Sequence, residues 1–307
     1  MNSVVKIQVC AGFVCWGGGI VIFIHTCYNF RAENAMTKLE YTFKTDTLFK
    51  MLFVKYPELL KRLVSELLGI RFESIGQFII TNPEMPPESL GDKFCRLDIN
   101  MTVEGRRVDL EIQVENEGDY PERALFYWAR EYSTALPAGG RYTDLPCAVT
   151  VSIIDFNLFN CPEFHSEFQP LEIARHELLS DKMSLHFFEL QKLPEEISAN
   201  NMLLLWLALF KAETEEDLKQ IEALEVPVMN QAINAYNSVK VSPEFREAER
   251  LYAKARHDEA QALHHARLEG AKQERETWQG VVAEKDAALT EQAALIAELR
   301  ARLGEGK

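Results

Sequence analysis

The stretch that decides the fold is residues 95–115, which read CRLDINMTVEGRRVDLEIQVE. Polar and apolar residues alternate on both sides of Glu104-Gly105, the period-two pattern of two half-buried strands joined by a tight turn. A two-residue loop makes Val103 face Arg106 and thereby fixes the pairing of every residue before and after it. The segment is therefore predicted to be one antiparallel β-hairpin.

This register gives the hairpin two chemically different faces. The core face is predicted to carry Leu97, Ile99, Met101, Val108, Leu110 and Ile112. The other face pairs Asn100 with Asp109 and Asp98 with Glu111, and it places Gln113 two residues further along. Opposed side chains in such a ladder lie about 5 Å apart at Cβ, and like charges there are destabilising without a cation between them. The pattern thus favours a divalent cation held by Asp98 and Glu111.

An ordinary sheet surface remains the alternative, because half the residues of a one-sided antiparallel sheet face water. If the metal hypothesis holds, a hard cation with oxygen ligands is expected, which means Mg²⁺, with Mn²⁺ as a substitute. Asp98 and Glu111 would hold the metal and the backbone carbonyl of Ile112 would complete its shell. Gln113 would orient a water or a phosphate oxygen. Such a metal lowers the pKa of a bound water, which can then attack a phosphodiester.

Bulk composition narrows the class of protein. The 307 residues are 47% hydrophobic, which predicts a globular protein, and the net charge of −14 leaves only a local basic patch for nucleic acid. Six cysteines occur without a CxxC motif, so neither a zinc site nor a disulfide framework is expected and cytoplasmic, reduced thiols are favoured. A Gly-rich phosphate loop and a nucleophile elbow are both missing from the sequence, which argues against a nucleotide cofactor and serine hydrolase chemistry.

The first 35 residues form a hydrophobic leader with three open interpretations. Residues 11–24 carry no charge, yet they are fewer than the roughly 20 that span a bilayer as a helix. A signal-like segment, a reading frame that naturally starts at Met36, and a folded extension all fit this stretch. A membrane partner for the remainder of the chain is not expected.

Helices and strands are predicted along the rest of the chain. Helices are expected over 44–56, 58–68, 121–135, 200–211, 214–224 and 227–239, and further strands over 147–156 and 184–190. From Pro243 to the end the sequence is dense in Ala, Glu, Arg and Lys, which predicts one long exposed helix. Val282, Leu289, Ile296 and Leu303 recur every seven residues within it. The repeat favours a coiled coil that joins subunits into a homo-oligomer, and a single charged helix is the alternative.

Several blocks, in order, resemble a known family. Asp98, Glu111 and Gln113 match the D…ExQ variant of the PD-(D/E)XK nuclease superfamily. The flanking blocks resemble its recombination-promoting nucleases or putative transposases: Asp46-Thr47-Leu48-Phe49-Lys50, Arg96-Leu97-Asp98-Ile99, Val108-Asp109-Leu110-Glu111-Ile112-Gln113, Glu122-Arg123-Ala124-Leu125-Phe126-Tyr127-Trp128 and Tyr132. The likeness runs from about Thr42 to Leu193.

The resemblance implies a bacterial, Mg²⁺-dependent DNA endonuclease that acts in recombination or transposition. It implies an α/β fold of the restriction-endonuclease type, with a mixed central sheet flanked by helices. The chain is accordingly divided into a leader (1–35), a nuclease-like core (36–195), a helical accessory region (196–242) and a long charged helix (243–307). Gln113 stands where the superfamily usually has Lys, so an inactive DNA-binding protein or an oligomeric scaffold remains the alternative function.

Two further groups of residues carry weaker predictions. Asp46 begins the first helix and would turn a carboxylate to the metal, or would only favour the helix dipole and pair with Lys50. Arg123, Tyr127 and Arg130 fall on one helical face, which would contact the phosphate backbone and a base of DNA. Packing of Tyr127 within an aromatic surface, with both arginines paired to acids, is equally open.

Overall fold

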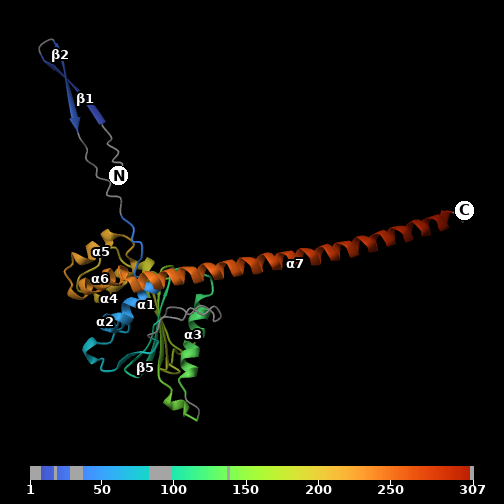
Figure 1. Cartoon of the computed structure of the whole chain (residues 1–307), viewed down its shortest axis with the longest axis horizontal. Coiled ribbons are helices and arrows are strands. Elements are labelled where there is room, and N and C mark those ends of the chain that lie inside the picture. The colour runs from blue at the N-terminus through green and yellow to red at the C-terminus, as the bar shows by residue number, and fades with distance from the viewer. Residues whose placement is uncertain (1–7, 17–18, 28–36, 83–98, 137–138, 305–307) are drawn as a thin grey trace.

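A computed structural model describes residues 8–16, 19–27, 37–82, 99–136 and 139–304. Its strands outside the N-terminal region are β3 (Phe78–Ile80), β4 (Ile99–Val103), β5 (Arg106–Gln113), β6 (Ala148–Ile154), β7 (His165–Phe168) and β8 (Met183–Glu189). These described strands form one sheet in the order β3-β4-β5-β6-β8-β7, in which β5, β6 and β8 run parallel and the other neighbours antiparallel (Figure 1). The predicted mixed central sheet is confirmed.

The β4–β5 hairpin has the predicted register. Val103 faces Arg106, and the pairing continues without a slip to Ile99 and Leu110. Glu104 and Gly105 both have positive φ, 48° and 74°, which suits a tight two-residue hairpin turn. The Glu104 carboxylate also accepts hydrogen bonds from the backbone amides of residues 76 and 77, at 2.6 and 2.7 Å. The turn is therefore tied to the edge strand β3 as well as to its own strands.

Helices cover both faces of the sheet. The α-helices are α1 (Asp46–Lys55), α2 (Pro57–Leu67), α3 (Tyr120–Thr134), α4 (Met202–Lys211), α5 (Glu215–Glu222), α6 (Pro227–Lys240) and α7 (Pro243–Gly304). Short 3-10 turns lie at η1 (Phe72–Ser74), η2 (Tyr142–Asp144) and η3 (Leu190–Lys192). All the helices predicted from sequence are present. The six shorter helices begin and end within two residues of the predicted bounds, and α7 begins at the predicted Pro243.

The larger hydrophobic core lies on one face of the sheet. Side chains of α1, α2, α4 and α6 pack there against the inward residues of β4, β5 and β6. Ile99, Met101, Val108 and Leu110 of the predicted core face are all buried in this cluster. The region after residue 196 therefore shares one core with the sheet. Its α4 is so apolar that six of its ten residues are buried.

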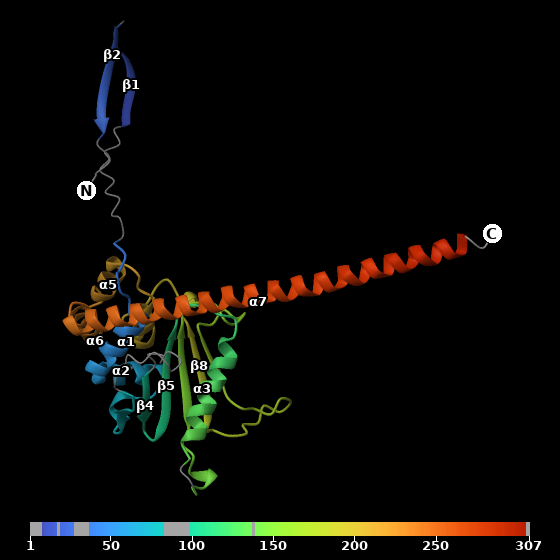
Figure 2. The same cartoon turned by 45° about the vertical axis from the view of Figure 1, so that its right-hand side comes forward.

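On the opposite face of the sheet, α3 packs against β5, β6 and β8 (Figure 2). A smaller cluster forms there from Tyr120 and Ala124 of α3 with Ile154, Leu185 and Phe187 of the strands. Trp128 adds a hydrogen bond of 2.9 Å from its indole Nε1 to the carbonyl of Ala148. This face carries the polar side chains of β5, so the packing of α3 determines how far they are exposed to solvent.

The sequence did not predict β3 and β7, the two edge strands. They are three and four residues long and therefore too short for a periodic pattern to stand out. The predicted strand near 184–190 is confirmed as β8, and the apolar run near 147–156 is confirmed as β6, with every residue buried. Continuous burial is typical of a parallel central strand covered on both faces.

The long helix α7 begins on the body and then leaves it. Phe245 is fully buried and packs edge-to-face on Tyr41, with ring centroids 4.9 Å apart. From residue 260 to 304 every described side chain is exposed, and Figure 1 shows this part of the helix extending away from the domain. The predicted long exposed helix is confirmed.

The N-terminal region holds an antiparallel hairpin of β1 (Gln8–Trp16) and β2 (Gly19–Cys27). It stands apart from the main body in both views (Figures 1 and 2). In the part of the chain that the structure describes, no helix has the length and apolar character needed to cross a bilayer.

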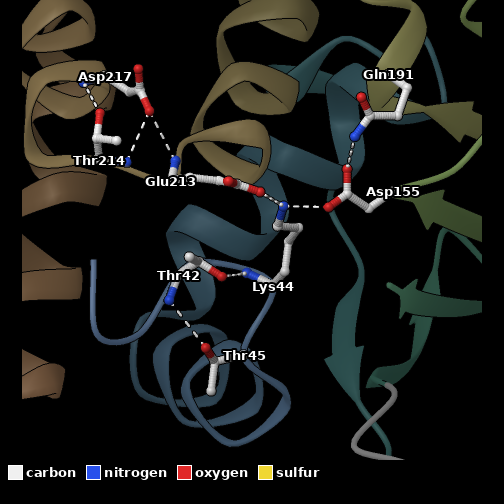
Figure 3. Close-up of polar contacts among 8 residues, drawn as sticks. All are labelled: Thr42, Lys44, Thr45, Asp155, Gln191, Glu213, Thr214 and Asp217. Carbon is white, nitrogen blue, oxygen red and sulfur yellow. Dashed lines mark hydrogen bonds and ion pairs between the residues drawn. The ribbon is translucent and has the colours of Figure 1, made fainter. Parts of the chain in front are cut away.

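A buried ion pair joins the segment before α1 to the end of β6. The ammonium of Lys44 contacts the carboxylate of Asp155 (Figure 3), and these side chains are only 6% and 8% exposed. Lys44 also reaches Glu213 at 3.3 Å, and Asp155 accepts a hydrogen bond of 2.7 Å from Gln191. Four segments that are distant in sequence thus meet at one point.

Replacing Lys44 by Met should lower the free energy of unfolding by about 3–5 kcal/mol, because removal of one partner leaves a buried charge without its counterion. Urea unfolding at neutral pH measures this. The control is Lys219→Met, whose pair with Glu216 is exposed and should contribute less than about 1 kcal/mol. A Lys44 variant as stable as the control would show that the pair does not hold these segments together.

Candidate active site

The candidate carboxylates of β5 are covered by α3. Asp109 is 3% exposed and Glu111 is 5% exposed. A solvent-facing sheet surface, the alternative considered for these residues, would leave them in water. Burying a carboxylate is costly unless it is hydrogen-bonded or paired. The local partners of Glu111 therefore decide what this face of the sheet can do.

Tyr120 is one such partner. As the first residue of α3, it lies over the sheet and its hydroxyl donates a buried hydrogen bond of 3.2 Å to Oε2 of Glu111. Burial raises the pKa of Tyr120 far above its ordinary value, and the negative charge of Glu111 adds to this. The phenol is therefore protonated at any physiological pH and acts as a donor.

Two buried hydroxyls lie beside these acids. The parallel pairing of β5 and β6 sets Thr150 next to Asp109 and Ser152 next to Glu111, with exposures of 2% and 0%. Neither hydroxyl oxygen has a partner of good hydrogen-bond geometry among the described residues. Ser152 is nonetheless close enough to Tyr120 to lower the pKa of that phenol, against the larger effect of burial. The face under α3 is thus rich in oxygen donors.

Gln113 ends β5, and its side chain is turned along its own strand. Its Nε2 donates a hydrogen bond of 2.9 Å to the carbonyl of Glu115, and its backbone carbonyl accepts from the amide of Asp155 at 2.9 Å. Because carbonyl groups along a strand point alternately to the two neighbouring strands, the carbonyl of Ile112 points away from β6. That is the direction of β4, which Asp98 directly precedes in sequence.

Asp98 lies outside the described residues, so its pairing with Glu111 stays a prediction. Among the residues that are described, no three His, Cys, Asp or Glu side chains gather into a cluster that could hold a metal.

Asp46 is the first residue of α1, the position predicted from sequence, and Thr45 is its N-cap. The Thr45 hydroxyl does not cap the helix and accepts instead from the amide of Thr42, at 3.1 Å (Figure 3). Partial burial raises the pKa of Asp46, Arg256 of α7 lowers it and Glu249 raises it. The charges that act on Asp46 in the described structure therefore belong to α7.

The three residues predicted to contact DNA differ in exposure. Arg123 is nearly buried: its guanidinium lies 4.8 Å from the ring centroid of Tyr120 and 3.3 Å from Glu117. Tyr127 is half-buried beside the exposed Phe126, with ring centroids 5.8 Å apart. Arg130 is exposed. Only Arg130 therefore presents its charge freely to the outside.

Sequence reasoning did not single out Tyr120, Ser152, Lys44 or Asp155. Tyr120 sits just before a predicted helix that starts with Pro121, and Ser152 lies in the apolar run predicted as a buried strand. A serine inside a fully buried strand is a signal that could have been read, because buried hydroxyls need a partner. The contact of Lys44 with Asp155 spans 111 positions and leaves no local pattern.

The protein thus has an α/β fold. Buried carboxylates of β5 and buried hydroxyls of β6 lie together inside its mixed sheet. Residues 43–266 match the family described as PD-(D/E)XK nuclease family transposase, and the chain belongs to that family. The match extends beyond the residues whose resemblance was noted, through α4–α6 and into α7. A search of curated proteins and a search of solved structures each gave no match.

Changing Asp46 to Asn should raise the melting temperature at pH 7 in the absence of divalent metal. Because folding raises the pKa of Asp46, its ionisation in the folded state costs stability above the unfolded-state pKa of about 3.9. Thermal unfolding at pH 7 and pH 3 tests this, and the gain should vanish at pH 3, where both states are protonated.

Asp217→Asn is a control of opposite sign. Burial raises the pKa of Asp217, but hydrogen bonds from the backbone of residues 213 and 214 and from the Thr214 side chain outweigh it and leave the pKa lowered (Figure 3). This variant should lose stability at pH 7 and lose less at pH 3, because the stabilisation fades as the pH falls toward the lowered folded-state pKa of Asp217. If Asp46→Asn also lost stability at pH 7, the prediction that ionised Asp46 destabilises the folded protein would be refuted.

Proposed function

We propose that this protein is a divalent-metal-dependent DNA endonuclease that hydrolyses phosphodiester bonds in recombination or transposition. Asp98 and Glu111 serve as metal ligands, with Gln113 as a positioning group. The observation that carries the proposal is the buried Glu111 of β5, which accepts a hydrogen bond from Tyr120 and lies beside Ser152 of β6, within the part of the chain that matches the family. The cytoplasm is the proposed location of this activity, since the cysteine pattern favours reduced thiols.

Oxygen donors on this face suit a hard cation. Glu111, Asp109 and the hydroxyls of Thr150 and Ser152 are all buried, and the two hydroxyl oxygens have no partner of good geometry among the described residues. Mg²⁺ prefers such ligands and keeps several of its waters, and Mn²⁺ can replace it. Asp98, Glu111 and the carbonyl of Ile112 would hold this ion, with Asp46 as a weaker candidate. When bound, it supplies Lewis-acid stabilisation and a water of lowered pKa.

The chain's own residues have separate tasks in this proposal. Glu111 is fixed in direction because the hydroxyl of Tyr120 donates a hydrogen bond to its carboxylate. Gln113 can offer an amide hydrogen to a phosphate oxygen after giving up its bond to Glu115, but it brings no positive charge. Arg130, the exposed arginine of α3, supplies a cationic contact to the DNA backbone that the net charge of −14 otherwise makes scarce, whereas Arg123 is held over the ring of Tyr120.

Changing Glu111 to Gln should reduce plasmid nicking with Mg²⁺ by about a hundredfold or more, because loss of a ligand forfeits several kcal/mol of metal stabilisation in the transition state. Supercoiled plasmid with purified residues 36–307 is the substrate, and EDTA should abolish nicking by the parent. Asp98→Ala should lose activity in the same way. Glu131→Gln is the control. Glu131 lies in α3 and its carboxylate pairs with Arg107 of β5, so this variant should keep the nicking activity.

A parent protein that leaves the plasmid intact with Mg²⁺ and Mn²⁺ would refute the nuclease assignment. Equal nicking by the parent and by Glu111→Gln would show instead that the metal site lies elsewhere. The first outcome leaves the inactive DNA-binding or scaffold protein as the function of the chain.

The exposed part of α7 favours a second, compatible role as an oligomerisation helix. Large apolar side chains are exposed along its outer half: Trp278, Val281, Val282, Leu289, Leu295, Ile296 and Leu299. Val282, Leu289 and Ile296 keep the spacing of seven residues, whereas Lys285 and Gln292 are polar at the companion positions. A coiled coil between copies would cover this stripe, and the polar positions would limit its strength.

A chain ending at residue 258 should therefore have a lower oligomeric state than the full chain and the same folded core. This end point keeps Phe245, Glu249 and Arg256, which contact or influence the body, whereas a cut at residue 246 would remove two of them. Light scattering gives the mass, and the melting temperature shows that the core is intact. A full chain that is monomeric at micromolar concentration would contradict the oligomer.

A further inference from the structure

The ring of Tyr120 is held on several sides. Phe156 and Phe187 meet it edge-to-face, with centroid distances of 5.9 and 6.2 Å, and the guanidinium of Arg123 covers it at 4.8 Å. The side chain is 1% exposed. Aromatic neighbours in edge-to-face contact limit both tilt and translation of a ring. The hydroxyl therefore has a fixed position relative to the sheet.

That hydroxyl points to the carboxylate of β5. It donates to Oε2 of Glu111, and Ser152 lies directly beside Glu111 on the neighbouring strand. The Ser152 oxygen is fully buried and has no partner of good geometry in the described part of the chain. One oxygen of Glu111 is thus fixed by a rigid donor, with the hydroxyl of Ser152 close by. A ligating carboxylate needs such support, because outer hydrogen bonds set the direction of its lone pairs.

Arg123 places a positive charge next to this pair. Its side chain is only 12% exposed and is tethered to Glu117 at 3.3 Å, so the guanidinium stays over the Tyr120 ring. A cation over the face of an aromatic ring is attracted by the ring's electrons, so the guanidinium at 4.8 Å acts on the phenol through its ring. A polarised phenol is a stronger donor to a carboxylate.

We propose that Tyr120 is the positioning residue of the site: its hydroxyl fixes the Glu111 carboxylate for a divalent cation, and Arg123 holds and polarises the ring. The proposal rests on the proposed function. It assigns a role to a residue that contacts neither DNA nor metal and acts through Glu111. Loss of the hydroxyl should weaken metal binding while the fold persists, because the ring and its packing remain in Phe.

Tyr120→Phe is tested by titrating Mg²⁺ into the DNA-free full chain in a calorimeter. The dissociation constant should rise about tenfold, the lower end of the effect of removing an outer-shell partner of a metal ligand. Tyr236→Phe is the matched control. Tyr236 is also fully buried and donates one hydrogen bond, 2.6 Å to the carbonyl of Tyr41, far along the chain from β5. It should bind Mg²⁺ as the parent does, despite a similar loss of stability.

The possible outcomes separate the two proposals. If the parent binds Mg²⁺ and Tyr120→Phe binds it equally well, the positioning role is wrong and the nuclease proposal is untouched. If both Tyr→Phe variants weaken binding alike, the effect is general destabilisation and the positioning role is again wrong. If the parent binds no divalent cation, the metal site and the role of Tyr120 fall together. The nicking assay should follow the same order, with activity recovered in Tyr120→Phe at higher Mg²⁺ concentration.

Discussion

The contact between Lys44 and Asp155 is the constraint around which the fold is arranged. Asp155 follows the central strand β6, and its amide also holds the carbonyl of Gln113, the last residue of β5. Lys44 precedes α1 by two residues and reaches Glu213, ahead of α5. One buried ammonium therefore connects the start of α1, the middle of the sheet and the later helices. This connection lies at the end of the sheet where β5 ends. Buried pairs of this kind add little net stability, but they penalise every arrangement in which one partner is left alone.

The same requirement, that a buried charge must have polar partners, applies to Glu111. A carboxylate on an exposed sheet face would be solvated and free to rotate, whereas beneath α3 it must be satisfied by the protein. Tyr120 provides part of that satisfaction, and the hydroxyls of Ser152 and Thr150 add polar surface that apolar packing alone would exclude. Unsatisfied hydroxyls in a close-packed region lower stability. Their presence between α3 and the sheet is understandable if this face is kept for binding an ion and its waters rather than for packing.

The sequence was most informative where structure is local. The turn at Glu104-Gly105 and the alternation around it determine the β4–β5 register, because a shift of one residue would exchange the two faces. The helices were found from apolar spacing for a similar reason. What alternation could not reveal is that α3 covers the polar face. The bond from Tyr120 to Glu111 depends on how α3 is docked, and docking depends on residues spread over β5, β6 and β8.

The replacement of the superfamily's usual Lys by Gln113 has an electrostatic consequence that the structure helps to assess. Gln113 is turned to the backbone of Glu115 and carries no charge, so cationic support for the acids must come from elsewhere. Arg123 is well suited, since its side chain is only 12% exposed and its guanidinium lies over the ring of Tyr120. It acts through the ring of Tyr120, however, and not at the phosphate. In the proposed nuclease, the carboxylate would be well oriented but no direct cation would stand at the scissile bond, so turnover is expected to depend strongly on the metal.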